Sequence, residues 1–288
     1  MAHLTTFQRG ALTMVASACC FAAMGAAVKV ASATLGNSQI VFCRNLLSLL
    51  LLLPWCARGG LSGLATEHLG EHLARGLFGL SAMYCFFYAI AHVRLADAML
   101  LNYTLPLFMP PIERLWLGER MSRRLLLPLG LGFLGILVIL RPGTGVFQPV
   151  ALWALVSALL GSVAQVGVRR LTATEPVTRI VFYFAAISTL VSAGPALFTW
   201  RTPSAAASLA LLVCGVTATL GQLLLTRAYG SAPAAWVGPF LYSSVVFAGL
   251  FDALLWGRSA DALFVLGALL VVAAGVITLR LRREPLRS

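Results

Sequence analysis

The sequence predicts an all-α integral membrane protein in which ten transmembrane helices form two inverted five-helix repeats. Three observations lead to this fold class: the composition, a series of apolar segments of membrane-spanning length, and an internal repeat. Of the 288 residues, 60% are hydrophobic and only 10% are charged, whereas a soluble domain carries about 25% charged residues. A soluble protein of this composition would lack the polar side chains needed to cover its surface.

Ten apolar segments follow one another along the chain, each close to the roughly 20 residues that cross a bilayer as a helix. They cover residues 9–31, 38–57, 72–92, 95–117, 123–141, 149–170, 177–200, 205–228, 232–256 and 260–281. The connections between them are short, and no low-complexity stretch separates independent domains. The chain therefore has little room for a soluble domain.

The basic residues predict the orientation of these segments. If the N-terminus is inside, 15 of the 21 Lys and Arg residues fall on the inner side and five on the outer side, and Arg44 lies within the second segment. Because inner loops carry the excess of Lys and Arg, both termini are predicted in the cytoplasm. The net charge of +12 does not indicate a nucleic-acid partner, since the basic residues stand singly or in pairs between apolar runs.

The second half of the chain repeats the first. Residues 88–141 align without a gap on 227–280 when the sequence is shifted by 139 positions. The matched pairs include Tyr103 with Tyr242, Glu113 with Asp252 and Gly118 with Gly257. Since each half has an odd number of helices, the second copy enters the membrane from the opposite side, an arrangement typical of transporters. We divide the chain into a first repeat, 1–145, and a second repeat, 146–288.

The stretch 88–141 resembles the second half of an EamA domain. The features that carry the resemblance are Pro106, the sequence LGER at 117–120, and a Gly-rich segment that ends in Arg141 and Pro142. Lys29 and Arg44 also match the family's pattern, whereas WGRS at 256–259 replaces a segment in which the family usually has an acidic residue. Over nearly its whole length the chain is thus similar to the ten-helix EamA-type family of the drug/metabolite transporter superfamily. This resemblance implies two five-helix repeats around a central cavity and leaves the substrate open among amino acids, sugars, drugs and other metabolites.

Polar side chains within membrane helices are costly and therefore mark candidate binding residues. The set that suits a largely neutral cavity with aromatic walls is Tyr84, Tyr88, Asn102, Tyr103, Gln165, Gln222, Trp236, Tyr242, Ser243 and Lys29. The alternative for each residue is hydrogen bonding and packing between helices. For both Lys29 and Arg44 the favoured interpretation is that the long side chain reaches the outer interface or pairs with a carbonyl at a helix end. The alternative is that it contacts a substrate carboxylate or forms an outer gate.

Two other patterns in the sequence do not indicate catalysis. His68, Glu71 and His72 form an HxxEH sequence, but it lies in a short loop without the third ligand that zinc catalysis needs. The six cysteines form no CxxC pair and lie in or beside apolar segments, so we expect free thiols. We accordingly expect no catalytic residue, no metal and no cofactor.

These observations predict an alternating-access transporter that exports amino acids with apolar or aromatic side chains, or similar small metabolites. Aromatic walls suit such side chains, and amide and hydroxyl groups suit a zwitterion. Two alternatives stay open: a membrane-embedded lipid-modifying enzyme, which would need clustered acids, an activated nucleophile or metal ligands, and a transporter of an unrelated drug or metabolite. The expected partners are a small-molecule substrate and the lipid bilayer, with a homo-oligomer left open, and the expected location is a bacterial inner (plasma) membrane.

Overall fold

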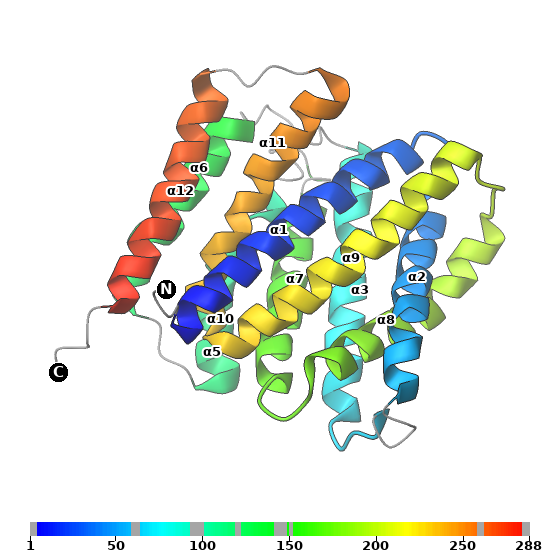
Figure 1. Ribbon diagram of the computed structural model, residues 1–288, viewed down its shortest axis with the longest axis horizontal. Coiled ribbons are helices and arrows are strands. Elements are labelled where there is room, and N and C mark those ends of the chain that lie inside the picture. The colour runs from blue at the N-terminus through cyan, green and yellow to red at the C-terminus, as the bar shows by residue number, and fades with distance from the viewer. Residues whose placement is uncertain are drawn as a thin grey trace.

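The structure is a computed structural model of the protein and describes residues 5–58, 64–92, 101–118, 122–140, 149, 152–257 and 262–283. Within these ranges the secondary structure is helical (Figure 1). The helices are α1 (Thr6–Ala31), α2 (Asn37–Arg58), α3 (Leu69–His92), α5 (Leu105–Leu117), α6 (Leu126–Leu140), α7 (Leu152–Leu171), α8 (Val177–Phe198), α9 (Ala205–Ser231), α10 (Ala234–Val237), α11 (Ser243–Trp256) and α12 (Ala262–Arg283), with 3-10 turns η2 (Arg123–Leu125) and η5 (Gly238–Tyr242).

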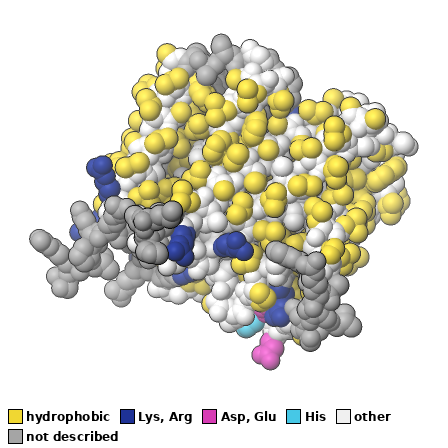
Figure 2. Space-filling model, viewed as in Figure 1, with side chains coloured by type: hydrophobic (Ala, Val, Ile, Leu, Met, Phe, Trp, Pro, Cys, Tyr) yellow, Lys and Arg dark blue, Asp and Glu magenta, His cyan; other side chains and the backbone are white. Residues whose placement is uncertain are grey.

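The predicted membrane fold is confirmed. By length and composition, seven stretches in the described ranges can cross a membrane: α1, α2, α7, α8, α9, α12 and the run from α10 into α11. The other three predicted segments contain α3, α5 and α6. Most of the surface drawn in Figure 2 is hydrophobic, and the charged side chains on that face lie toward its lower and left margins. Such an apolar exterior, with Leu190 and Leu254 each 79% exposed, requires lipid to cover it.

The two halves pack against each other through equivalent pairs of helices. α1 lies along α9, and α7, the counterpart of α1, lies along α3, the counterpart of α9. The same hydrogen bond recurs in both contacts: Ser17 Oγ donates to the carbonyl of Gly221 (2.8 Å), and Ser157 Oγ donates to the carbonyl of Ala82 (2.7 Å). α2 packs on its counterpart α8, and α6 on its counterpart α12. This symmetric pairing of helices from the two repeats is the packing that an inverted repeat requires.

The predicted segments 95–117 and 232–256 are interrupted, although each was expected as one helix containing a proline. In the first half, Tyr103 and Thr104 form a turn before α5 begins. Residues 95–100 of this predicted segment lie outside the described ranges. In the second half, η5 separates α10 from α11. Proline near the start of a helical turn needs no donor there, and Pro106 and Pro239 occupy such positions in α5 and η5.

The two interrupted helices end alike. Gly118 follows α5 with φ 69° and Gly257 follows α11 with φ 66°, and these are the glycines with positive φ in the described ranges. A left-handed residue ends many helices, and glycine adopts this conformation without a Cβ clash. Their spacing of 139 residues confirms the alignment of the two repeats.

The turns after α1 and α7 also share one backbone conformation. The amide of Leu35 donates to the carbonyl of Ala31 (3.1 Å), and the amide of Glu175 donates to the carbonyl of Leu171 (2.8 Å). Leu35 and Glu175 are both buried, at 6% and 7% exposure. The two equivalent turns therefore have the same backbone hydrogen bond, but one buries an apolar side chain and the other buries a carboxylate.

The start of α1 and the end of α12 lie at the same end of the bundle (Figure 1), as an even number of crossings requires. The side of the membrane on which this end lies stays a prediction, and so does the boundary between residues 145 and 146, which lies outside the described residues. The free-thiol expectation is confirmed for Cys19, Cys20, Cys43, Cys85 and Cys214; the side chain of Cys56 is not among those described.

Candidate functional site

Two arginines are buried in the interior of the bundle. Arg44 on α2 is 3% exposed and Arg75 on α3 is 4% exposed. Both face the ring of Phe184 on α8: the Cζ atom of Arg75 lies 3.7 Å from the ring centroid and that of Arg44 lies 5.9 Å from it. Both distances are within the range at which a cation is attracted to an aromatic face. The result is a cluster of two cations around one ring.

The helices explain why the arginines meet. Arg44 lies about 10 Å from the first residue of α2 and Arg75 about 9 Å from the first residue of α3. Because α2 and α3 are antiparallel neighbours in the chain, the two side chains enter the bundle from opposite ends (Figure 1). Gly79, one turn after Arg75, leaves room for the guanidinium, since a Cβ there would lie 2.5 Å from Arg75 Nη1 and 3.1 Å from Phe184 Cε2.

The hydrogen bonds of the pair use only part of its donors. Arg75 Nη2 donates to Gln222 Oε1 (3.0 Å), and Arg44 Nη1 donates to Asn45 Oδ1 (2.7 Å). The Nε atoms of both arginines are buried without a hydrogen-bond partner. Within the described part of the chain, no carboxylate forms an ion pair with either guanidinium. Two positive charges thus lie inside the bundle without a neutralising side chain from the residues that the structure describes.

Other buried polar atoms lack a partner on the helices that carry this cluster and on α7. They include the Tyr84 hydroxyl on α3, Ser188 Oγ on α8 and Gln165 Oε1 on α7. Ser188 lies one turn after Phe184 and so shares its face of α8. Buried polar groups are normally hydrogen-bonded, and each exception calls for an explanation.

Three of the predicted binding residues belong to this part of the bundle. Gln222 bonds to Arg75, Tyr84 packs against Val41 of α2, and Gln165 projects from α7 with its Oε1 buried. Lys29 lies in the last turn of α1 and is half-buried.

A second group of predicted residues lies against α6 and α12. Tyr103 and Tyr242 share a hydrophobic cluster with Ile136 of α6 and Val271 of α12. The Tyr103 hydroxyl accepts a 2.6 Å hydrogen bond from Ser244, whereas the Tyr242 hydroxyl is buried without a partner. The structure thus brings together the two tyrosines that the repeat alignment matched.

Of the last four predicted residues, three make helix–helix contacts and Ser243 forms a local hydrogen bond. Asn102 Oδ1 accepts from Ser157 (2.9 Å), and the ring of Tyr88, 44% exposed, meets Trp153 edge to face at 5.7 Å. Trp236 meets Phe7 edge to face at 6.2 Å. Ser243 Oγ donates to the carbonyl of Phe240 (2.6 Å). A role of these residues in lining a substrate path stays a prediction.

Arg75 and Phe184 were not among the residues predicted from the sequence, and the interpretation that the Arg44 side chain reaches the outer interface is wrong. Arg44 does not reach the outer interface, because its side chain is buried and bonded to Asn45. Arg75 was counted with the inner-side charges because it stands only three residues after the expected start of the third segment, whereas α3 begins at Leu69 and the Arg75 side chain is buried in the bundle. The one available signal was Gly79, a small residue one turn after a cation.

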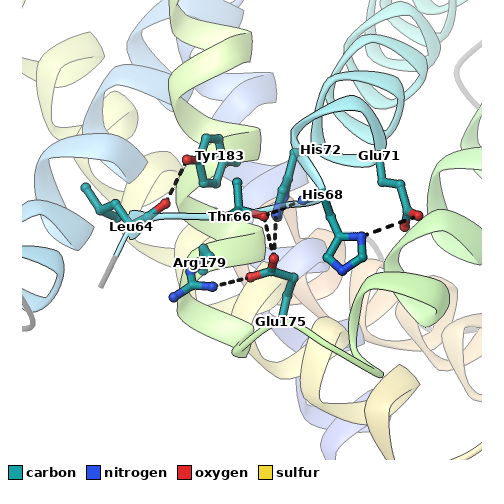
Figure 3. Close-up of polar contacts among 8 residues, drawn as sticks. All are labelled: Leu64, Thr66, His68, Glu71, His72, Glu175, Arg179 and Tyr183. Carbon is teal, nitrogen blue, oxygen red and sulfur yellow. Dashed lines mark hydrogen bonds and ion pairs between the residues drawn. The ribbon is translucent and has the colours of Figure 1, made fainter. Parts of the chain in front are cut away.

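A separate polar cluster joins the two repeats at the end of the bundle where α1 begins (Figures 1 and 3). Glu175, in the turn before α8, accepts hydrogen bonds from Thr66 and from Arg179 (2.7 Å). His72 Nε2 lies 3.9 Å from Glu175 Oε1, and the His72 ring stacks on Tyr183 at 4.4 Å. Tyr183 in turn donates to the carbonyl of Leu64 (2.8 Å). We call this set the Glu175 cluster.

The electrostatics of the Glu175 cluster favour a charged carboxylate. Burial alone would raise the pKa of Glu175, but the hydrogen bonds from Thr66 and Arg179 and the charges of Arg179 and His72 lower this pKa below its usual value. Nearby, Glu71 accepts from Arg170 (3.1 Å). Of the HxxEH residues, Glu71 therefore pairs with Arg170, and His72 lies beside Glu175. The described residues contain no group of three or more side chains that could hold a metal ion.

A helical bundle of two inverted repeats with charged side chains in its interior defines a class of proteins, the multi-pass membrane transporters of small molecules. The family can be named more narrowly. Residues 8–141 and 148–280 each match the model of the EamA-like transporter family, and the chain belongs to this family. Family membership makes the protein a transporter and sets aside the lipid-modifying enzyme.

Individual proteins similar to this chain carry several substrates. The pseudopaline exporter CntI of Pseudomonas aeruginosa is 34% identical over 282 residues, which cover 97% of this chain and 99% of that protein. A riboflavin transporter of Brucella anthropi is 26% identical, over 93% and 97% of the two chains. An S-adenosylmethionine uptake transporter of Rickettsia prowazekii is 23% identical, over 88% and 86%. A solved crystal structure shares the fold with a TM-score of 0.79 at 21% identity, covering 96% of this chain and 99% of that one.

Proposed function

We propose that the protein is an alternating-access exporter of amino acids or similar small metabolites. The observation that carries this proposal is the equivalent packing of α1 on α9 and of α7 on α3. Because the two contacts are equivalent, loosening one while the other stays closed produces a state open on one side, and the reverse produces a state open on the other side.

Export and the substrate class are supported by separate observations. The pseudopaline exporter is the relative that covers this chain at 34% identity, and this supports export. Amide and hydroxyl groups beside aromatic rings, as with Gln165, Gln222 and Tyr84, suit a zwitterionic metabolite with an apolar portion. The riboflavin and S-adenosylmethionine transporters show that other metabolites are carried by related proteins.

The proposed location is a bacterial inner membrane with both termini in the cytoplasm. The support is the excess of Lys and Arg on the side of the termini in the sequence. The Glu175 cluster then lies at the cytoplasmic end of the bundle. Assembly into a homo-oligomer stays a prediction.

Transport by purified protein in liposomes tests this function. Liposomes are loaded with unlabelled amino acids, and uptake of each labelled counterpart by exchange is measured beside protein-free liposomes. We expect exchange of at least one amino acid or close derivative. Exchange of riboflavin or S-adenosylmethionine alone would contradict the substrate choice, and no exchange of any solute would contradict the transporter function itself.

A further inference from the structure

The charges of the buried pair Arg44 and Arg75 have no carboxylate partner among the described residues. We propose that the two arginines form the binding site for a dianionic oxyanion portion of the transported metabolite, either two carboxylates or one phosphate monoester. This inference rests on the proposed function, because it assigns a substrate class to that transporter.

The rest of the chain shows how this protein treats buried and interfacial charge. Glu175, at 7% exposure, has Arg179 at 2.7 Å, and Glu71 has Arg170 at 3.1 Å. A charge in a protein interior is costly unless it is paired and hydrogen-bonded. Arg44 and Arg75 are buried as deeply as Glu175, yet within the described ranges neither has a carboxylate partner. A bound anion would supply the missing charge.

The donors that remain on the arginines suit an oxyanion. A guanidinium has five N–H groups in a planar fork that matches the two oxygens of a carboxylate or a phosphate. Arg75 uses Nη2 on Gln222 and Arg44 uses Nη1 on Asn45, and the Nε atoms of both have no partner. An anion with two charges would neutralise both groups at once.

The surroundings hold the guanidinium of Arg75 in place. Phe184 packs against it at 3.7 Å, and the absence of a side chain at Gly79 leaves the space that the guanidinium occupies. Fixed orientation reduces the ordering cost of binding. Ser188 and Tyr84 bring further buried hydroxyls without partners on the neighbouring α8 and α3.

The cluster also has the position that an alternating-access site needs. Arg44 and Arg75 come from the first repeat, whereas Phe184 and Gln222 come from the second. α2 packs on α8 and α9, and α3 packs on α8. Any movement of one repeat against the other therefore changes the contacts of the arginines, as expected of a site at the repeat interface.

Binding is tested by thermal denaturation of the detergent-purified full chain with three probes: glutarate, its neutral diamide glutaramide, and inorganic phosphate. We expect glutarate, phosphate or both to raise the denaturation midpoint in a saturable way, and glutaramide to leave it unchanged. The two anions distinguish a carboxylate site from a phosphate site. In the Arg44→Gln and Arg75→Gln proteins the apparent affinity for the effective anion should fall at least tenfold.

The matched control is Arg170→Gln, which removes a half-exposed arginine paired with Glu71 and should bind the anion as the wild type does. Arg75→Lys keeps the charge without the fork and should bind more weakly than wild type but more tightly than Arg75→Gln. If the Gln variants do not fold, the Arg75→Lys protein and the comparison of glutarate with glutaramide in the wild type decide the question.

A midpoint that rises equally with glutaramide, equal anion binding by the Arg44→Gln, Arg75→Gln and wild-type proteins, or no response to either anion would overturn the proposal. Exchange of neutral solutes in liposomes that is unaffected by both Gln variants would overturn it as well and would leave the proposed function standing. Anion binding without exchange of any solute would keep the site and contradict the transporter function.

Discussion

Gly135 on α6 and Gly267 on α12 face each other so closely that a Cβ atom on Gly135 would lie 2.7 Å from the Gly267 carbonyl oxygen, and one on Gly267 would lie 2.6 Å from the Gly135 carbonyl oxygen. The α6 and α12 backbones therefore approach each other closely at this pair of glycines. Gly132 and Gly275 instead make room for the rings of Tyr242 and Phe240, and nothing lies within 4 Å of a Cβ on Gly130.

Replacing Gly267 by Ala should destabilise the protein by about 1–3 kcal/mol, because an added carbon in a well-packed contact forces the helices apart. The measurement is the thermal midpoint of the purified protein. Gly130→Ala is the matched control, since its methyl group meets open space and alanine favours a helix. Equal thermal midpoints for the two variants would contradict the prediction, because they would mean that α6 and α12 can move apart without loss of stability.

Glu113 of α5 fixes the start of the interrupted helix in the other repeat. Its carboxylate accepts hydrogen bonds from the backbone amides of Ala234 and Ala235, the latter at 2.9 Å. Glu113→Ala should leave buried donors unsatisfied and cost about 1–3 kcal/mol of stability. Glu67→Ala, at an exposed position, should leave the midpoint unchanged, and a similar small effect of both changes would argue against this capping role.

The Glu175 cluster should make stability depend on pH. The pKa of Glu175 is lower in the folded protein than its usual value near 4.5. The stabilisation is therefore complete above that usual pKa and is lost as the pH falls through the lower, folded pKa. The thermal midpoint of the wild type should drop more steeply below about pH 4.5 than that of Glu175→Gln. Parallel curves for the two proteins would contradict the assignment.

Substitutions of the two tyrosines matched by the repeat should affect stability and substrate selectivity differently. Tyr103→Phe removes the 2.6 Å hydrogen bond from Ser244 and should cost about 1 kcal/mol. Tyr242→Phe removes a hydroxyl that has no partner and should not destabilise the protein. If both rings also line the substrate path, Tyr103→Ala and Tyr242→Ala should alter apparent affinity or selectivity in the liposome assay; unchanged transport by both would remove them from the binding site.

Orientation is tested by thiol labelling of single cysteines in a protein lacking its native cysteines. Ser38, at the beginning of α2, should react with a membrane-impermeant reagent from outside, and Ser122, which precedes η2, should react only after the membrane is opened. The reason is the excess of basic residues on the side of the termini. Reaction of Ser122 from outside would reverse the proposed topology.

The sequence by itself determined the features that depend on residues close together in the chain or on a comparison of its two halves. Apolar segments of a given length predict transmembrane helices because the thickness of the bilayer sets the number of residues needed to cross it. The shift of 139 residues related Gly118 to Gly257 before their shared left-handed conformation was known. The EamA resemblance added the transporter family, which the family match of both halves confirmed.

Only the tertiary structure decided which polar side chains meet. From the sequence, Arg75 stood near the inner end of the third segment and was counted as an inner-side charge, whereas α3 begins three residues earlier than expected and the Arg75 side chain is buried. The hydropathy of a segment does not determine its first residue that closely. Phe184 and Gln222 are more than 100 residues away from Arg75 in the chain, and they reach it only because the inverted repeat packs α3 and α2 against α8 and α9. Hydropathy reports that a segment is buried in a membrane, whereas the rotation and crossing of the helices determine which face carries the buried charge.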